Sequence, residues 1–160
     1  MSKTIGAASS SNAPLSSILC GVSGEYFVAA ELSRRGYIAS LTLRNTRGID
    51  ILASNVEATR SVGIQVKTGQ GAERSWLVGR HVEEGTAENL FFVFVRLNSG
   101  GAPAFHVVPR AEVARFAGER YRRWLKRPGR RGQAHDAANP IRKFQDPNDE
   151  YLDRWELLGL

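Results

Sequence analysis

The segment LFFVFVRL, at positions 90–97, is almost entirely apolar, so both faces of a strand formed there have to be covered. A strand of this kind belongs in the middle of a sheet, with other elements packed on each side. Shorter apolar runs that alternate with polar residues occur before and after it, at 37–43, 49–54, 61–68, 75–78 and 104–109. We therefore expect a central mixed β-sheet of about five strands.

Two longer segments have helical periodicity instead. Apolar residues recur at three- and four-residue steps from Leu15 to Leu32, and Gly36 follows as a natural helix stop. Ser23 and Gly24 are poor helix formers, so the alternatives are two helical pieces or a start near Ser23. Residues 110–127 repeat the pattern, residues 128–149 are expected to form a polar loop, and 150–160 a short amphipathic helix that docks on the core. Helices flanking one mixed sheet define the α/β class.

The length of 160 residues suits one domain, which we expect to span 14–160 behind a disordered tail of residues 1–13. A single cysteine excludes an internal disulfide framework. The histidines lack the spacing of metal ligands, and His106 falls in an apolar strand where a structural role is expected. No apolar run is long enough to span a bilayer. These features predict a soluble cytoplasmic protein that does not bind membranes.

The formal net charge of +6 favours a polyanionic partner, and nucleic acid is the commonest one. Seven basic residues and one acid occupy positions 118–132. Arg127, Arg130 and Arg131 of this stretch are candidate phosphate contacts. The alternative is a basic, solvated helix face whose aromatic residues belong to the core.

Polar residues interrupt two neighbouring strands in a way that folding does not require. Gln65 and Lys67 alternate with apolar residues and so share one strand face, and Asp50 opens the preceding strand. A hairpin would bring Asp50 near both of them. The residues alone fit a structural role, as an Asp–Lys ion pair or a solvated sheet face, as well as they fit a functional site. Glu25, beside Gly24 in the first helix, is either a favourable acid near the helix start or a fourth member of this group.

In this order, GEYFVAAELSRRGY, GIDILAS and IQVKT resemble the motifs of the PD-(D/E)xK nuclease superfamily, whose fold is restriction-endonuclease-like. The helix pattern is similar to that of archaeal Holliday junction resolvases. The Gln-x-Lys form of the last motif resembles methyl-directed restriction enzymes. The resemblance covers residues 21–68.

The resemblance implies metal-dependent hydrolysis of DNA phosphodiester bonds with Mg²⁺ or Mn²⁺. Asp50, the Gln65 side chain and the Val66 carbonyl would be metal ligands, and Glu25 would bind the metal directly or through water. Lys67 would orient or help deprotonate the attacking water. All of these ligand atoms are oxygens, which hard divalent cations prefer.

The sequence departs from the common superfamily pattern at two positions. Ile49 precedes Asp50 where proline is usual, and this position is tolerant. Gln65 stands where many members have a carboxylate, so the oxygen is kept while a negative charge is lost. Metal binding is therefore expected to be weak until a substrate phosphate joins the site.

Further residues near these motifs are expected to contact DNA, whether duplex or branched. They are Arg44, Arg47, Gln70 and Arg74. A homodimer would suit a cut in both strands. Two other functions stay open: a non-catalytic nucleic-acid-binding module of the same fold, and an accessory interaction subunit of a defence or toxin system.

Overall fold

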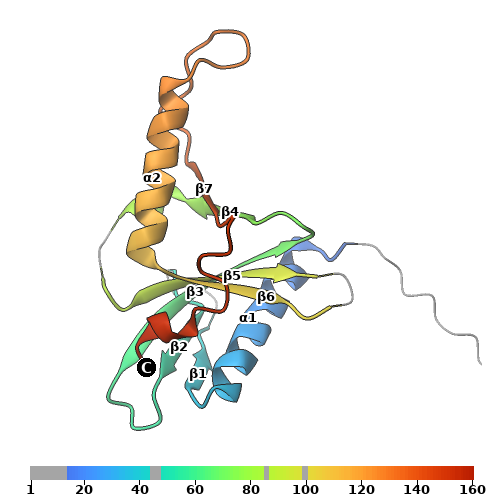
Figure 1. Ribbon diagram of the computed structural model, residues 1–160, viewed down its shortest axis with the longest axis vertical. Coiled ribbons are helices and arrows are strands. Elements are labelled where there is room, and N and C mark those ends of the chain that lie inside the picture. Colours follow the sequence, from blue (N-terminus) through green and yellow to red (C-terminus); the bar gives the residue numbers. More distant parts are fainter. Residues whose placement is uncertain (1–13, 44–47, 85–86, 99–100) are drawn as a thin grey trace, which may run out of the picture.

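The structure is a computed structural model that describes residues 14–43, 48–84, 87–98 and 101–160. Its centre is a five-stranded mixed sheet in the order β1-β2-β3-β5-β6 (Figure 1). All neighbouring strands are antiparallel except β3 and β5, which run parallel. The strands are β1 (Ile38–Leu41), β2 (Ile51–Ser54), β3 (Ser61–Gln70), β5 (Leu90–Leu97) and β6 (Ala104–Pro109). The α/β class with about five strands is confirmed.

One face of the sheet is covered by helix α1 (Ser17–Arg34) and by the C-terminal end of the chain. Val28 and Leu32 of α1 are buried against Ile64 and Val93 of the two central strands. The helix starts at Ser16, whose side chain accepts a hydrogen bond from the N–H of Leu19. This N-cap fixes where α1 begins along the sheet.

The opposite face carries a second core around Phe92 and Phe94 of β5. Two strands that form their own small sheet, β4 (Ser75–Gly79) and β7 (Ile141–Gln145), pack here together with the start of helix α2 (Arg110–Lys126). Because both faces of β5 are buried, the expectation that residues 90–97 form a central strand is confirmed. The far end of α2 and the loop after it project away from the central sheet (Figure 1).

The polar loop predicted at 128–149 is partly wrong, because it contains β7. In the segment IRKFQ, Arg142 and Phe144 point inward, and an arginine at a buried position conceals the strand pattern. Arg142 can be buried because it forms an ion pair with Glu83 and its guanidinium lies 3.4 Å from the centre of the Tyr121 ring.

The C-terminal segment docks on the core as expected, with Trp155 and Leu158 buried beside α1 and the sheet. Its helix is shorter than predicted, a single 3-10 turn η2 (Trp155–Leu158), and a second short turn η1 (Arg80–Glu83) follows β4. Within the described ranges, no helix is long and apolar enough to cross a membrane.

Candidate active site

Asp50 is fastened to β3 by hydrogen bonds to the residues on either side of Gln65. Its Oδ2 accepts from the N–H of Val66 at 2.7 Å, and its own N–H donates to the carbonyl of Ile64 at 2.8 Å. The β2–β3 ladder ends at the pair Ile51–Ile64, so the carboxylate takes the place of a strand partner for Val66. Asp50 thus lies just before β2, at the open end of the hairpin.

The carbonyl of Val66 is directed toward the same side of β3 as its N–H, because both groups of one residue face the same neighbouring strand. That N–H is the one bonded to the Asp50 carboxylate. The carbonyl oxygen of Val66 and the Asp50 carboxylate are therefore neighbours beyond the end of the β2 ladder.

Gln65 and Lys67 share one face of β3, as the sequence predicted. In the parallel ladder they pair with Phe92 and Phe94, which point into the second core. Both polar side chains are half-buried. A Cβ built at Gly48 would lie 4.0 Å from the amide nitrogen and oxygen of Gln65, so this amide extends toward the loop before Asp50.

The ion pair that the sequence left open does not form. Among the ion pairs of the described residues, none joins Lys67 to Asp50. The Asp50 carboxylate is held by a backbone N–H instead. The Lys67 ammonium group is therefore not tied to this acid and can serve a bound phosphate or water.

Helix α1 approaches the same stretch of β3 at Gly24. A Cβ at Gly24 would stand 1.8 Å from Oγ1 of Thr68, the residue after Lys67. Glu25 follows in the helix and is half-buried. The first turn is held as well, because the Gln70 amide donates to the carbonyl of Leu15 at 2.9 Å and accepts from its N–H at 2.8 Å.

The helix contact sets the position of Glu25 along β3 but does not put it on the Gln65 face. Thr68 pairs with Val95 of the first core, so α1 packs on the sheet face opposite Gln65 and Lys67. The structure therefore places the Asp50 carboxylate beside Val66, between Gln65 and Lys67 of β3, whereas α1 meets the opposite face of β3 at Thr68. A role for Glu25 in holding metal stays a prediction.

The available donor atoms fit a hard divalent cation. One carboxylate oxygen of Asp50 is used by Val66, and the other carboxylate oxygen, the amide oxygen of Gln65 and the Val66 carbonyl are oxygen donors on or next to this stretch of β3. Mg²⁺ and Mn²⁺ prefer such ligands and keep several waters in the shell. These residues suit the ion that the sequence motif implies.

Two of the predicted DNA contacts lie outside the described residues, and two have partners within the protein. The two that lie outside the described residues are Arg44 and Arg47. The Gln70 amide is engaged with the start of α1, and Arg74 forms an ion pair with Asp149 at 2.9 Å and donates to the carbonyl of Pro147. Their predicted contact with DNA is not tested by these bonds.

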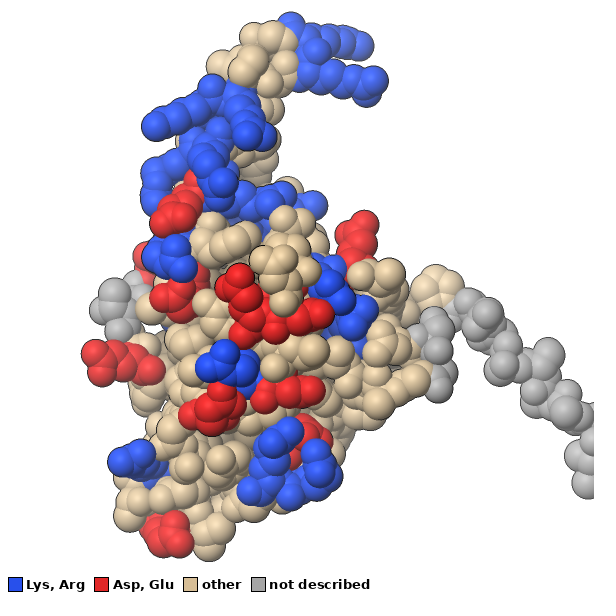
Figure 2. All heavy atoms as spheres, viewed as in Figure 1, with Lys and Arg blue, Asp and Glu red and all other residues tan. Residues whose placement is uncertain are grey.

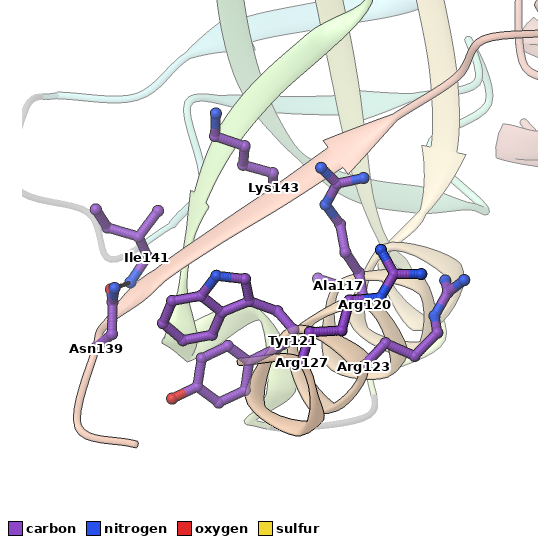
Figure 3. Close-up of a pocket in the computed structure, with 9 residues that line it drawn as sticks. Ala117, Arg120, Tyr121, Arg123, Arg127, Asn139, Ile141 and Lys143 are labelled. Carbon is purple, nitrogen blue, oxygen red and sulfur yellow. Dashed lines mark hydrogen bonds between the residues drawn. The ribbon is translucent and has the colours of Figure 1, made fainter. Parts of the chain in front are cut away.

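Arg127 lines a cavity of about 450 Å³ between α2 and β7, and Arg130 and Arg131 are exposed in the loop after α2. Figure 3 shows arginines of α2 on one wall of this cavity and Lys143 of β7 on the other. The sequence does not predict the cavity, because the polar residues around β7 are typical of a loop. Its lining residues are Ala117, Arg120, Tyr121, Arg123, Trp124, Arg127, Asn139, Ile141 and Lys143.

A buried His–Asp pair ties β6 to the C-terminal segment. His106 Nδ1 lies 2.7 Å from Oδ2 of Asp146, and both residues are almost fully buried. Asp146 also accepts from the N–H groups of Glu150 and Tyr151. The prediction that His106 is structural agrees with this geometry. Its partner was missed, although an aspartate beside the turn residues Pro147 and Asn148 is a usable signal.

No protein-family model and no curated protein matches this chain. Among solved structures, the chain is similar to a Holliday junction resolvase from the archaeal hyperthermophile Archaeoglobus fulgidus. The two share 16% identity, with a TM-score of 0.44, over 79% of this chain and 84% of the resolvase. At this level of similarity, the functional residues have to be assigned from the geometry of the chain itself.

Proposed function

We propose that the protein is a metal-dependent nuclease that hydrolyses DNA phosphodiester bonds at Asp50, Gln65 and Lys67, with Glu25 as a further ligand. The observation that carries this proposal is the fixed position of Asp50. Its carboxylate is bonded to the N–H of Val66, between the two polar residues of the Gln-x-Lys motif. An acid held beside an amide and an amine in the middle of β3 is an arrangement that suits phosphate chemistry.

Each residue has a distinct role in this mechanism. A divalent ion, when bound, would polarise the phosphate and lower the pKa of a water molecule. Asp50 would hold it with one carboxylate oxygen while the Val66 N–H fixes the other. Gln65 and the Val66 carbonyl would be further protein ligands, and Glu25 would bind the ion directly or through water. Lys67 would orient the attacking water and balance negative charge that develops on the phosphoryl oxygens.

Cleavage assays test this proposal directly. Supercoiled plasmid and a branched duplex are incubated with Mg²⁺ or Mn²⁺ and the wild type, Asp50→Ala or Lys67→Ala. Arg115→Ala removes one exposed positive charge outside the site and is the control. We expect cleavage by the wild type and the control alone. Cleavage of equal rate in all four proteins would contradict the assigned site.

A non-catalytic nucleic-acid-binding module is the second candidate, because the positive charge is concentrated at the far end of α2. It predicts DNA binding that survives in Asp50→Ala and no cleavage by any protein with either metal. An accessory interaction subunit predicts a third result: weak DNA binding with little dependence on salt. Size-exclusion chromatography of the wild type with and without DNA tests the expected homodimer.

A further inference from the structure

The net positive charge of the protein is confined to one short part of the chain. Residues 120–131, which we name the basic arm, contain seven Lys and Arg and no Asp or Glu. The other 148 residues carry 15 Lys and Arg against 16 Asp and Glu, which is close to neutral. Figure 2 shows this charge gathered over the end of α2 that projects from the sheet.

The basic arm lacks close ion pairs within the described part of the chain. Among the ion pairs of the described residues, none involves a lysine or arginine of positions 120–131. By contrast, Arg115, one turn before the arm, is paired with Glu112 at 2.6 Å. Seven unpaired cations on one projection repel each other, so a polyanion bound there would be favoured.

Some of these charged residues line the cavity between α2 and β7 and are thereby arranged around one groove. Arg120 and Arg123 of α2, Arg127 directly after it and Lys143 of β7 line it, and its lining contains no acid among the described residues (Figure 3). Arg123, Arg127 and Lys143 are exposed, so their charged groups can reach a ligand. Arginine and lysine presented from two walls of a groove are suited to phosphate groups.

The aromatic residues beside the cavity are engaged with each other. The Trp124 ring stacks on His135 with centroids 3.9 Å apart and on Tyr121 with centroids 5.6 Å apart. The guanidinium of Arg142 lies over the ring of Tyr121. Proteins that bind single strands offer open aromatic faces to the bases. Here the rings support the wall, and the phosphate backbone is the part of a nucleic acid that the groove can hold.

We propose that the basic arm, together with Lys143 of β7, binds the phosphate backbone of duplex DNA without contacting bases, with Arg123 and Arg127 as the contacts of the arm. The arm stands on the sheet face that also carries Gln65 and Lys67, since β4, β7 and the start of α2 pack on that face. The arm would therefore bind the same duplex as the proposed active site, at phosphates some distance from the bond that is cut. The choice of duplex DNA as the polyanion rests on the proposed function. The inference that the groove binds anions does not, because it comes from the lining residues.

Binding can be measured without cleavage. Fluorescence anisotropy of a short labelled duplex is followed in EDTA over a salt series, for wild type, R123A/R127A and R115A/R154A. Both double variants lose two positive charges, but Arg115 and Arg154 are exposed and paired with acids. We expect the slope of log affinity against log salt to fall by about two in R123A/R127A, with binding weaker on the order of tenfold near physiological salt. R115A/R154A should bind as the wild type.

Two further measurements separate the effect of charge from the effect of folding and from base stacking. R123K/R127K should restore most of the binding, because lysine keeps the charge, and matched thermal unfolding of all variants would show that folding is intact. Equal losses in both alanine variants, or no loss in either, would overturn the proposal. So would tighter binding of a single strand with quenching of Trp124 fluorescence, since bases would then stack on the rings.

The result separates this proposal from the proposed nuclease function. If the basic arm binds duplex and no metal supports cleavage, the arm proposal stands and the nuclease proposal fails. If DNA cleavage depends on Asp50 and R123A/R127A binds duplex as the wild type does, the nuclease proposal stands and the arm proposal fails.

Discussion

Gly24 of α1 lies so close to Thr68 of β3 that a Cβ at Gly24 would stand 1.8 Å from Thr68 Oγ1 and 2.9 Å from its Cβ. Only glycine permits this approach of helix to strand. This contact places α1 against the residue that follows Lys67. Glu25, the next residue of the helix, therefore lies near this part of β3. The packing of one helix thereby determines where a predicted site residue stands.

Gly24→Ala should destabilise the protein by roughly 1–3 kcal/mol, because the added methyl group displaces Thr68 or the helix. Gly21→Ala is the matched control on the same helix, since nothing lies within 4 Å of its Cβ position. That change should be neutral or stabilising by up to about 1 kcal/mol. Urea unfolding of both variants checks the difference. Equal stability of the two would contradict the close approach at Gly24.

Replacing Asp50 separates its structural from its chemical role. Asp50→Ala should lower stability by roughly 1–3 kcal/mol, because the buried N–H of Val66 loses its acceptor. Asp50→Asn keeps an oxygen acceptor and should cost less. Both variants should lose cleavage by at least about 100-fold, since neither has a carboxylate for the metal. Thermal melts and plasmid nicking rates measure the two effects, and an active Asp50→Asn would contradict the ligand role.

Gln65→Glu should strengthen metal binding, because it adds a negative charge to the proposed metal ligands. We expect the Mn²⁺ affinity to rise on the order of tenfold. Calorimetric titration of Mn²⁺ into the protein without DNA measures this, and Gln65→Ala should bind more weakly than the wild type. An unchanged affinity in all three proteins would place the metal elsewhere.

Asp146→Ala should be among the most destabilising single changes in the chain. It removes the partner of the fully buried His106 and the acceptor for the N–H groups of Glu150 and Tyr151. Breaking such a buried pair costs about 3 kcal/mol. Denaturant unfolding measures the loss, and Glu88→Ala, an exposed acid, is the control. A loss no larger than that of the control would mean that the pair contributes nothing.

The ion pairs of Glu31 predict a pH-dependent contribution from α1. Arg34 and then Arg35, at 2.7 and 2.9 Å, lower the pKa of Glu31 below its ordinary 4.5. A depressed folded-state pKa stabilises the protein above the unfolded value, and this gain is lost as the pH falls through the folded value. Glu31→Gln should therefore cost up to about 1 kcal/mol at neutral pH. The difference from wild type should vanish well below pH 4.5, as measured by urea unfolding over pH.

Local pattern determined much of this protein. Strict alternation in SVGIQVKT placed Gln65 and Lys67 on one face, and the continuous apolar run at 90–97 required a central strand. Both depend only on neighbouring residues in an extended chain, where side chains alternate faces. The α/β class and the end of α1 follow from equally local signals.

Tertiary structure decided the rest, because contacts between distant residues leave no periodic trace. The hydrogen bond between Asp50 and Val66 depends on where the β2–β3 ladder ends. Strand β7 depends on the burial of Arg142, whose partner Glu83 lies far back in the sequence. The groove of the basic arm exists only because β7 runs beside α2. The sequence determined which side chains are available, and long-range packing decided which of them meet.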